Sequence, residues 1–299
     1  MKQTAARSHY TAHYKKIMEV RILRTMNFDP GLNREYARSL GRAFAGALLF
    51  SLPILMTMET WALGTFIDRE RLALLLVLLV PVLVGLSYFS GFEETTQLRD
   101  AVIDAFVAIV VACVVAIVFL TLFGALDAGM NAAEWIGKLV IQAVPAGIGA
   151  LLAQSQFGRQ REEQQKRRDS GDFGEYFFMC AGALFFAANV APTEEVVLLS
   201  YMLSTWQSIG LVAVSLTLMH VFVYSVEFKG QHDRPEGTSG FSMFLRFSVV
   251  GYVMALLISA YICWSIGRFD GLSLQAMLEA SIVLGFPATV GAATARLVL

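Results

Sequence analysis

The stretch GALLFSLPILMTMETW, residues 46–61, recurs 136 residues later as GALFFAANVAPTEEVV, residues 182–197. Glycine, phenylalanine, threonine and glutamate occupy matching places in the two copies, so that Glu59 falls opposite Glu195. Further matches follow in the same order along each copy and end with PAGIGA in the first and PATVGA in the second. The order of these matches predicts two related halves of four helices each.

The composition is that of an integral membrane protein. Hydrophobic residues make up 56% of the 299-residue chain, charged residues only 16%, and the mean hydropathy is +0.60. Soluble domains usually carry about 25% charged residues. The N-terminal segment contains no apolar run, so we expect no cleavable signal peptide. The three cysteines fall in apolar runs without CxxC spacing, and we expect them to be small buried residues.

Apolar runs of about 20 residues predict helices that cross a bilayer. We expect eight, at residues 41–66, 72–92, 101–123, 136–157, 175–204, 207–227, 242–266 and 278–299. The fifth is too long for an untilted span and is expected to tilt or break, and seven spans remain an alternative. The fold class is therefore all-α, a polytopic integral membrane protein with about eight transmembrane helices. Because each half has an even number of helices, the halves are expected to be parallel repeats.

The charged segments divide the chain and predict its orientation. We expect a basic cytoplasmic arm (1–40), a first four-helix repeat (41–157), a charged cytoplasmic linker (158–174) and a second repeat (175–299). With the N-terminus inside, the inner segments carry 18 lysines and arginines and the outer loops carry 3. Such an excess marks the cytoplasmic side. We therefore expect a multi-pass inner-membrane protein with both termini in the cytoplasm.

Two matched glutamates form the candidate ion site. Glu59 and Glu195 fall within apolar stretches, where an ionisable side chain costs about 2.5–3.5 kcal/mol and usually faces protein or water. Brought together on an axis between the halves, they would share a proton or bind a cation. Thr57 and Thr193 each precede one of these glutamates by two residues and could add hydroxyl ligands. Glu194 is a second-rank candidate, because it has no carboxylate counterpart in the first half.

Prolines in the same helices and in the fourth helix of each half are expected to kink them. A proline lacks an amide donor and frees the carbonyl four residues earlier. Kinked helices together with carboxylates are typical of ion sites in transporters. The prolines concerned are Pro53, Pro145, Pro192 and Pro287.

A second interpretation of the glutamates is local. They lie toward the outer ends of their spans, where Glu194 and Glu195 would enrich the first turn of a short helix that begins at Pro192, with Thr193 near its cap. Both interpretations stay open. His220, the one histidine expected inside a span, could relay protons to Glu195 or could be a hydrogen-bonded structural residue.

The fourth and eighth predicted helices carry small residues at four-residue spacing, among them Ala146 with Ala150 and Ala288 with Ala292. This spacing lets helix backbones approach closely. We expect these two helices to pack tightly, either between the halves or between protomers.

Enzyme motifs are weak in this sequence. It has no P-loop, no GxGxxG, no GxSxG and no paired-histidine zinc motif within the predicted spans. TEEVVLLSY followed by His220 resembles the glutamic intramembrane proteases of the CAAX-processing type. Those proteases carry an arginine after the glutamates, near where this chain has Leu199, and a second histidine on a later helix, which the predicted spans lack. We therefore expect no enzyme, with an intramembrane hydrolase as the least favoured alternative.

Three stretches carry a resemblance to a known family: GALLFSLPILMTMETW, SGFEETTQLRDAVIDAF (90–106) and APTEEV. They resemble a bacterial family of integral membrane proteins that has eight predicted transmembrane helices and is defined by a domain of unknown function. The resemblance runs from about residue 40 to the end of the chain. It implies the same helix count and, because such genes often occur in pairs, a small membrane partner protein. It implies no activity and no site residues.

Together these observations predict a transport protein, either a channel or a secondary carrier, that moves a small cation or protons between two repeats. The main alternative is a non-transporting scaffold or sensor that works with a partner subunit. We expect the lipid bilayer and the transported ion as partners, and the sequence is compatible with a homo-oligomer. We expect no nucleic acid and no cofactor, and the sequence assigns no metal.

Overall fold

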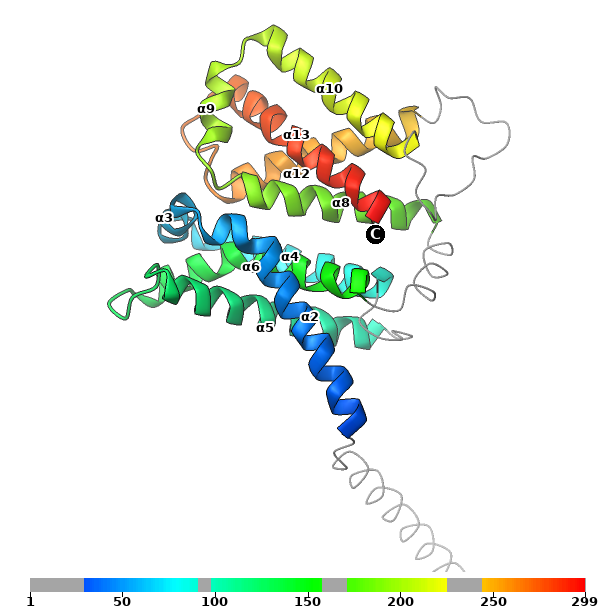
Figure 1. Ribbon diagram of the computed structural model, residues 1–299. Coiled ribbons are helices and arrows are strands. Elements are labelled where there is room, and N and C mark those ends of the chain that lie inside the picture. Colours follow the sequence, from blue (N-terminus) through cyan, green and yellow to red (C-terminus); the bar gives the residue numbers. More distant parts are fainter. Residues whose placement is uncertain (1–29, 91–97, 158–170, 225–243, 299) are drawn as a thin grey trace, which may run out of the picture. The chain divides into compact units, whose positions relative to one another are not determined.

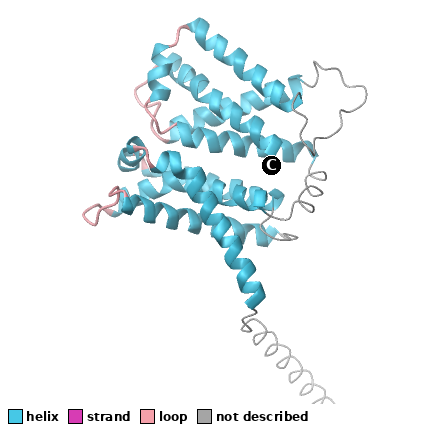
Figure 2. Ribbon diagram, in the orientation of Figure 1, coloured by secondary structure: helices cyan, strands magenta, loops and turns pink. Residues whose placement is uncertain are grey.

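The computed structural model describes residues 30–90, 98–157, 171–224 and 244–298, and this part of the chain contains helices and no strand (Figures 1 and 2). The chain divides into two units, Met1–Gly41 and Arg42–Leu299; the helix Pro30–Leu55 begins in the first, and every side-chain contact described below belongs to the second. Most of the predicted N-terminal arm and of the predicted linker lies outside the described residues.

The described helices are α2 (Pro30–Leu55), α3 (Met58–Phe66), α4 (Arg69–Ser90), α5 (Leu98–Leu122), α6 (Ala132–Phe157), α8 (Gly171–Val190), α9 (Glu195–Met202), α10 (Thr205–Tyr224), the π-helix η1 (Phe244–Val249), α12 (Val250–Ser265) and α13 (Leu274–Val298). Seven of them are long and apolar enough to cross a membrane, and α2 with α3 makes an eighth if the bent pair is one span. The predicted all-α membrane fold with about eight spans is confirmed.

Two of the predicted spans are broken helices. The fifth breaks into α8 and α9, as its length suggested. The first was predicted as one kinked helix, which is wrong: it consists of α2 and α3, bent by 85°. α2 ends where Thr57 Oγ1 donates to the carbonyl of Pro53 at 2.5 Å and Trp61 Nε1 donates to that of Leu55 at 3.0 Å. Because side chains satisfy these last carbonyls, the chain can leave the helix and turn into α3.

Each half packs its first helix against its fourth through a pair of glycines. A Cβ added to Gly46 would lie 2.4 Å from the carbonyl oxygen of Gly149, and one added to Gly182 would lie 2.3 Å from that of Gly291. Backbones come this close only where side chains are absent. α6 and α13 do pack tightly, but these contacts lie within each half, whereas packing between the halves or between protomers was expected. The two pairs hold matching places in the sequence copies, which supports the two-repeat arrangement, and that arrangement stays a prediction.

Aromatic side chains join the two halves. Phe50 of α2 meets Phe185 of α8 edge to face, with ring centroids 5.4 Å apart. Phe89 of α4 lies 5.2 Å from Phe177 and 5.8 Å from Phe178, both on α8. Such pairs add about 0.5–1.5 kcal/mol each beyond the burial of their area. The halves thus meet in part through aromatic side chains of α8.

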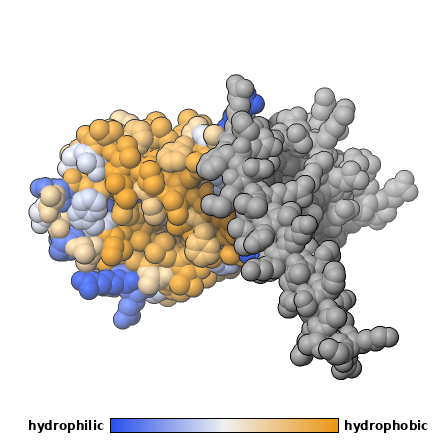
Figure 3. Space-filling view, turned by 90° about the horizontal axis from the view of Figure 1, so that it is seen from below, coloured by the Kyte–Doolittle hydropathy of each residue, from blue (hydrophilic) through white to orange (hydrophobic). Residues whose placement is uncertain are grey.

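The outward surface is apolar, with polar and aromatic residues at one end. The face seen in Figure 3 is mostly hydrophobic, and hydrophilic residues gather at the end that carries α3. All four tryptophans lie at this end: Trp61, Trp135, Trp206 and Trp264. We call it the break end, formed by residues 56–71, 123–135, 191–206 and 264–274, because both helix breaks lie there. Tryptophan is enriched where helices meet the membrane–water interface, so the break end lies near such an interface.

Candidate functional site

The second helix break is held by an arginine from the loop between α12 and α13. Thr193 Oγ1 donates to the carbonyl of Val190 at 2.8 Å. Beyond it, Arg268 donates through Nε to the carbonyl of Ala191 at 3.3 Å and through Nη2 to that of Pro192. Carbonyls at a helix end lack partners within the helix. The Arg268 guanidinium supplies those partners here and is thereby fixed at the break.

The three candidate glutamates lie at the starts of the short helices. Glu59 is the second residue of α3 and is half-buried. Glu195 is the first residue of α9 and follows Glu194, and both are exposed. A carboxylate in the first turn is stabilised by the helix dipole, as the local interpretation expects. One detail of that interpretation is wrong, because Pro192 lies in the turn ahead of α9 and not at its first position.

Glutamates from both halves act on a single guanidinium. Burial lowers the pKa of Arg268 below its ordinary value, and the carboxylates of Glu194, Glu59 and Glu195 oppose this shift, Glu194 most strongly. Arginine stays charged at physiological pH despite such a shift. Among the described residues its hydrogen bonds go to backbone carbonyls and none to a carboxylate. Three carboxylates therefore lie within electrostatic range of a positive charge that the backbone holds in place.

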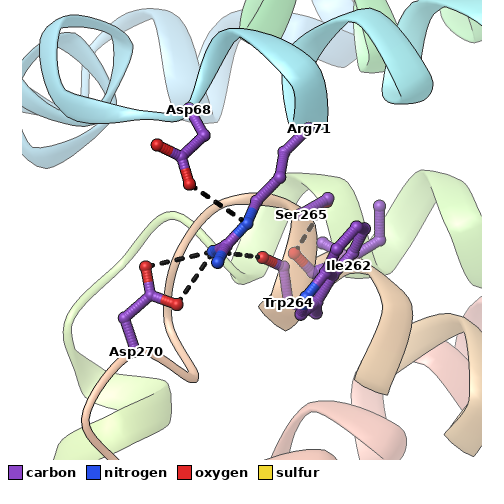
Figure 4. Close-up of polar contacts among 6 residues, drawn as sticks. All are labelled: Asp68, Arg71, Ile262, Trp264, Ser265 and Asp270. Carbon is purple, nitrogen blue, oxygen red and sulfur yellow. Dashed lines mark hydrogen bonds and ion pairs between the residues drawn. The ribbon is translucent and has the colours of Figure 1, made fainter.

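A second arginine ties the two halves together at the break end (Figure 4). Arg71, at the start of α4, donates through Nη1 to both carboxylate oxygens of Asp270, at 2.9 and 3.0 Å, and to the carbonyl of Trp264 at 3.1 Å. Its Nε lies 3.4 Å from Asp68, and its guanidinium carbon lies 5.2 Å from the centre of the Trp264 ring. The loop that supplies Asp270 also supplies the arginine at the second break, so this one loop contacts both halves.

The two threonines expected as ligands use their hydroxyl protons locally. Thr57 and Thr193 both donate to carbonyls of the helix they follow. Each oxygen keeps lone pairs, so each could still accept a hydrogen bond or contact a cation.

His220 lies away from the break end. It stands 15 residues after the first residue of α10, which is about 22 Å along the helix. It is half-buried, and its Nδ1 lies 3.1 Å from Ser248 Oγ in η1. The structure does not bring His220 to Glu195, and this contact favours the structural alternative.

The four prolines fall into two groups. Pro53 lies in the last turn of α2, and Pro192 lies in the second break, so both accompany helix ends. Pro145 and Pro287 lie inside α6 and α13, which continue past them. The structure therefore associates the first group with the candidate site and places the second within the packed fourth helix of each half.

Three polar residues at or near the breaks were not predicted as site residues. Arg268 entered the prediction only as a loop charge. Lys138 of α6, only 6% exposed, donates to the carbonyl of Ala125 at 2.7 Å. Gln142 of α6, only 1% exposed, donates through Nε2 to the carbonyl of Ile54 at 3.1 Å. Lys138 and Gln142 could have been singled out from the sequence, because each is a polar side chain within an apolar span.

Comparison with known families agrees with the membrane architecture. The family model described as "Putative integral membrane protein (DUF2391)" matches residues 39–299. The chain belongs to this family. The match confirms the family resemblance of the sequence and, with seven to eight candidate spans, a multi-pass integral membrane protein. No curated protein and no solved structure matches the chain.

Proposed function

We propose that this protein moves a small cation or protons across the membrane through a site at the break end, between its two halves. The observation that supports this proposal is that Glu59 and Glu195, from different halves, begin the short helices α3 and α9 that follow the two helix breaks. Arg268 is held at the second break by backbone carbonyls, and the charges of both glutamates favour its charged form. With Glu194, the cluster has three acidic side chains and one guanidinium, a formal excess of two negative charges. An excess of negative charge beside broken helices is the arrangement that attracts cations in transporters.

In this proposal Arg268 is a fixed internal counter-charge. Its hydrogen bonds to the carbonyls of Ala191 and Pro192 hold it at the break. A positive charge there would reduce the repulsion between carboxylates that lie within its electrostatic range. Glu59 is the half-buried member of the cluster and so the one best shielded from bulk water. We assign it as the principal ion or proton ligand, with Glu195 as its partner from the other half.

The orientation belongs to the same proposal. The distribution of lysine and arginine supports cytoplasmic termini and an outward-facing break end in the inner membrane. The distance along α10 between its start and His220 argues against a hydrolase that would need this histidine beside Glu194. A scaffold or sensor role with a partner protein is the remaining alternative, and it is favoured by the exposure of Glu194 and Glu195 at helix starts.

Ion flux into proteoliposomes tests the proposal. A pH-sensitive dye would be followed under imposed proton, sodium, potassium and calcium gradients for the wild type and for Glu59→Gln/Glu195→Gln. Glu134→Gln is the matched control. Glu134 also lies at the break end, where its Oε1 accepts from Asn131 Nδ2 at 2.7 Å, and a glutamine oxygen can keep that bond.

We expect the wild type and Glu134→Gln to carry ions at similar rates. Ion flux in Glu59→Gln/Glu195→Gln should be at least tenfold lower. Equal flux in the double variant and the wild type would eliminate this site. No flux from folded wild type under any gradient would eliminate transport and favour the scaffold.

A further inference from the structure

Two buried side-chain oxygen atoms, one on α3 and one on α6, lack hydrogen-bond partners among the described residues. They are Oε1 of Gln142 on α6 and Oγ1 of Thr60 on α3, and each side chain is 1% exposed. A threonine inside a helix usually donates to the carbonyl of the preceding turn, which Thr60 does not do here. Leaving such a buried group unpaired destabilises the fold. Buried polar groups of this kind are regularly satisfied by bound water.

The orientation of the Gln142 amide follows from its neighbour. Nε2 donates to the carbonyl of Ile54 at 3.1 Å, at the end of α2. Rotating the amide by half a turn would set its oxygen against the Ile54 oxygen, two acceptors face to face. The unpartnered oxygen therefore points away from Ile54.

Thr60 lies on the face of α3 that packs against α6. A Cβ added to Gly64 would lie 2.7 Å from the Cα of Lys138, so Gly64 sits directly on α6 one turn before Gln142. Thr60 and Gly64 are the two buried residues of α3 and lie one turn apart on one face of that helix. Thr60 therefore faces α6, the helix that carries Gln142.

We propose that a water molecule binds between Gln142 Oε1 and Thr60 Oγ1 and hydrates the protein interior next to Glu59, so that the carried species is the proton. This inference rests on the proposed function. A buried water makes about three hydrogen bonds, which an amide oxygen and a hydroxyl group that can donate and accept largely supply. A metal ion would need a fuller set of oxygen ligands than these two groups provide.

The second half supports an asymmetric arrangement. At the matched position of α13 it has Leu284, which is fully buried. There the break is held by Arg268 instead. The contact between α3 and α6 in the first half is therefore polar and uncharged, whereas a charged arginine holds the break in the second half. The half-buried Glu59 belongs to α3 and so lies at the uncharged contact.

Two readouts test the proposal on the intact protein in liposomes. The first is transfer of magnetisation from water to the Gln142 side-chain amide in solid-state NMR, with Gln142→Leu identifying the signal. The second is proton flux for Thr60→Val, which removes the hydroxyl and keeps the shape. Thr60→Ser keeps the hydroxyl. Thr289→Val is the control, because Thr289 is equally buried but its hydroxyl already donates to the carbonyl of Gly285 at 2.6 Å.

We expect a water signal at Gln142 in the wild type and in Thr60→Ser, and its loss in Thr60→Val together with about tenfold slower flux. Thr289→Val should match the wild type. Absence of the water signal in folded wild type overturns the binding site, whatever the flux. If the wild type shows the water signal but Thr60→Val carries protons as fast as the wild type, the water has no part in proton transfer. If Thr60→Val fails to fold, the wild-type signal still decides the site. Failure of the proposed transport function can be told apart from failure of the water site. In that case the wild type would carry no ion, while the water signal could still be measured.

Discussion

The glycine pair between α8 and α13 makes a strong prediction about stability. In Gly182→Ala the new Cβ would lie 2.3 Å from the carbonyl oxygen of Gly291 and 2.5 Å from Cβ of Ala295. Ordinary contacts begin near 3.4 Å, so the two helices would have to separate by about 1 Å. Overpacking of this kind costs about 1–3 kcal/mol, and the higher helix propensity of alanine returns about 1 kcal/mol. We expect the free energy of unfolding to fall by up to about 2 kcal/mol relative to the wild type, and by about 1–3 kcal/mol relative to a glycine-to-alanine change that meets no clash.

Thermal unfolding in detergent, followed with a thiol-reactive dye that detects the exposure of buried Cys263, would measure this loss. Gly210→Ala is the matched control, because nothing lies within 4 Å of a Cβ at that position of α10. The control should be as stable as the wild type or slightly more so, since only helix propensity changes. Gly182→Ala unfolding at the same temperature as Gly210→Ala would refute the close approach of α8 and α13.

Contacts at the break end and in α10 allow three further tests. Arg71→Ala and Asp270→Ala, alone and together, should show a coupling free energy of about 1 kcal/mol, limited by the solvent exposure of the carboxylate; strictly additive effects would contradict the bridge between the halves. Trp61→Phe removes the donor to the carbonyl of Leu55 and should lower the free energy of unfolding by about 1 kcal/mol in the same assay, whereas an unchanged value would mean that this bond does not secure the first break. His220→Gln should leave proton flux within about twofold of the wild type, and a tenfold loss would return this histidine to the proton path.

Much of the fold could be predicted because a bilayer imposes a simple physical demand. Apolar runs of sufficient length must be helices, and a tilt or a break was expected in the fifth span because that run exceeds one span; the structure shows a break between α8 and α9. The break between α2 and α3 was missed, since α2 and α3 together read as one apolar run. The end of α2 is held in part by the side-chain amide of Gln142, which donates to the carbonyl of Ile54 from 88 residues away along the chain. No local pattern could reveal that contact.

The candidate site was predictable only in part. The sequence repeat identified Glu59 and Glu195 as a matched pair, and their common effect on Arg268 is consistent with that expectation. Arg268 itself could not be assigned, because a single arginine in a short loop serves equally well as a topology signal. Its role depends on the carbonyls of Ala191 and Pro192, which become available only once the helix has broken. The position of this charge at the break is thus a consequence of the fold.

The central claim, that carboxylates from the two halves meet at one site, is tested most directly by cross-linking within one chain. Cysteines would replace Glu59 and Glu195 in a variant without the three native cysteines, and a short bifunctional thiol reagent would be applied in native membranes. Glu59→Cys with Leu98→Cys is the control pair, because Leu98 begins α5, about 36 Å along that helix from the break end. We predict an intramolecular cross-link for the first pair and none for the second. Failure of the first pair to cross-link in folded protein would contradict a shared site between the halves.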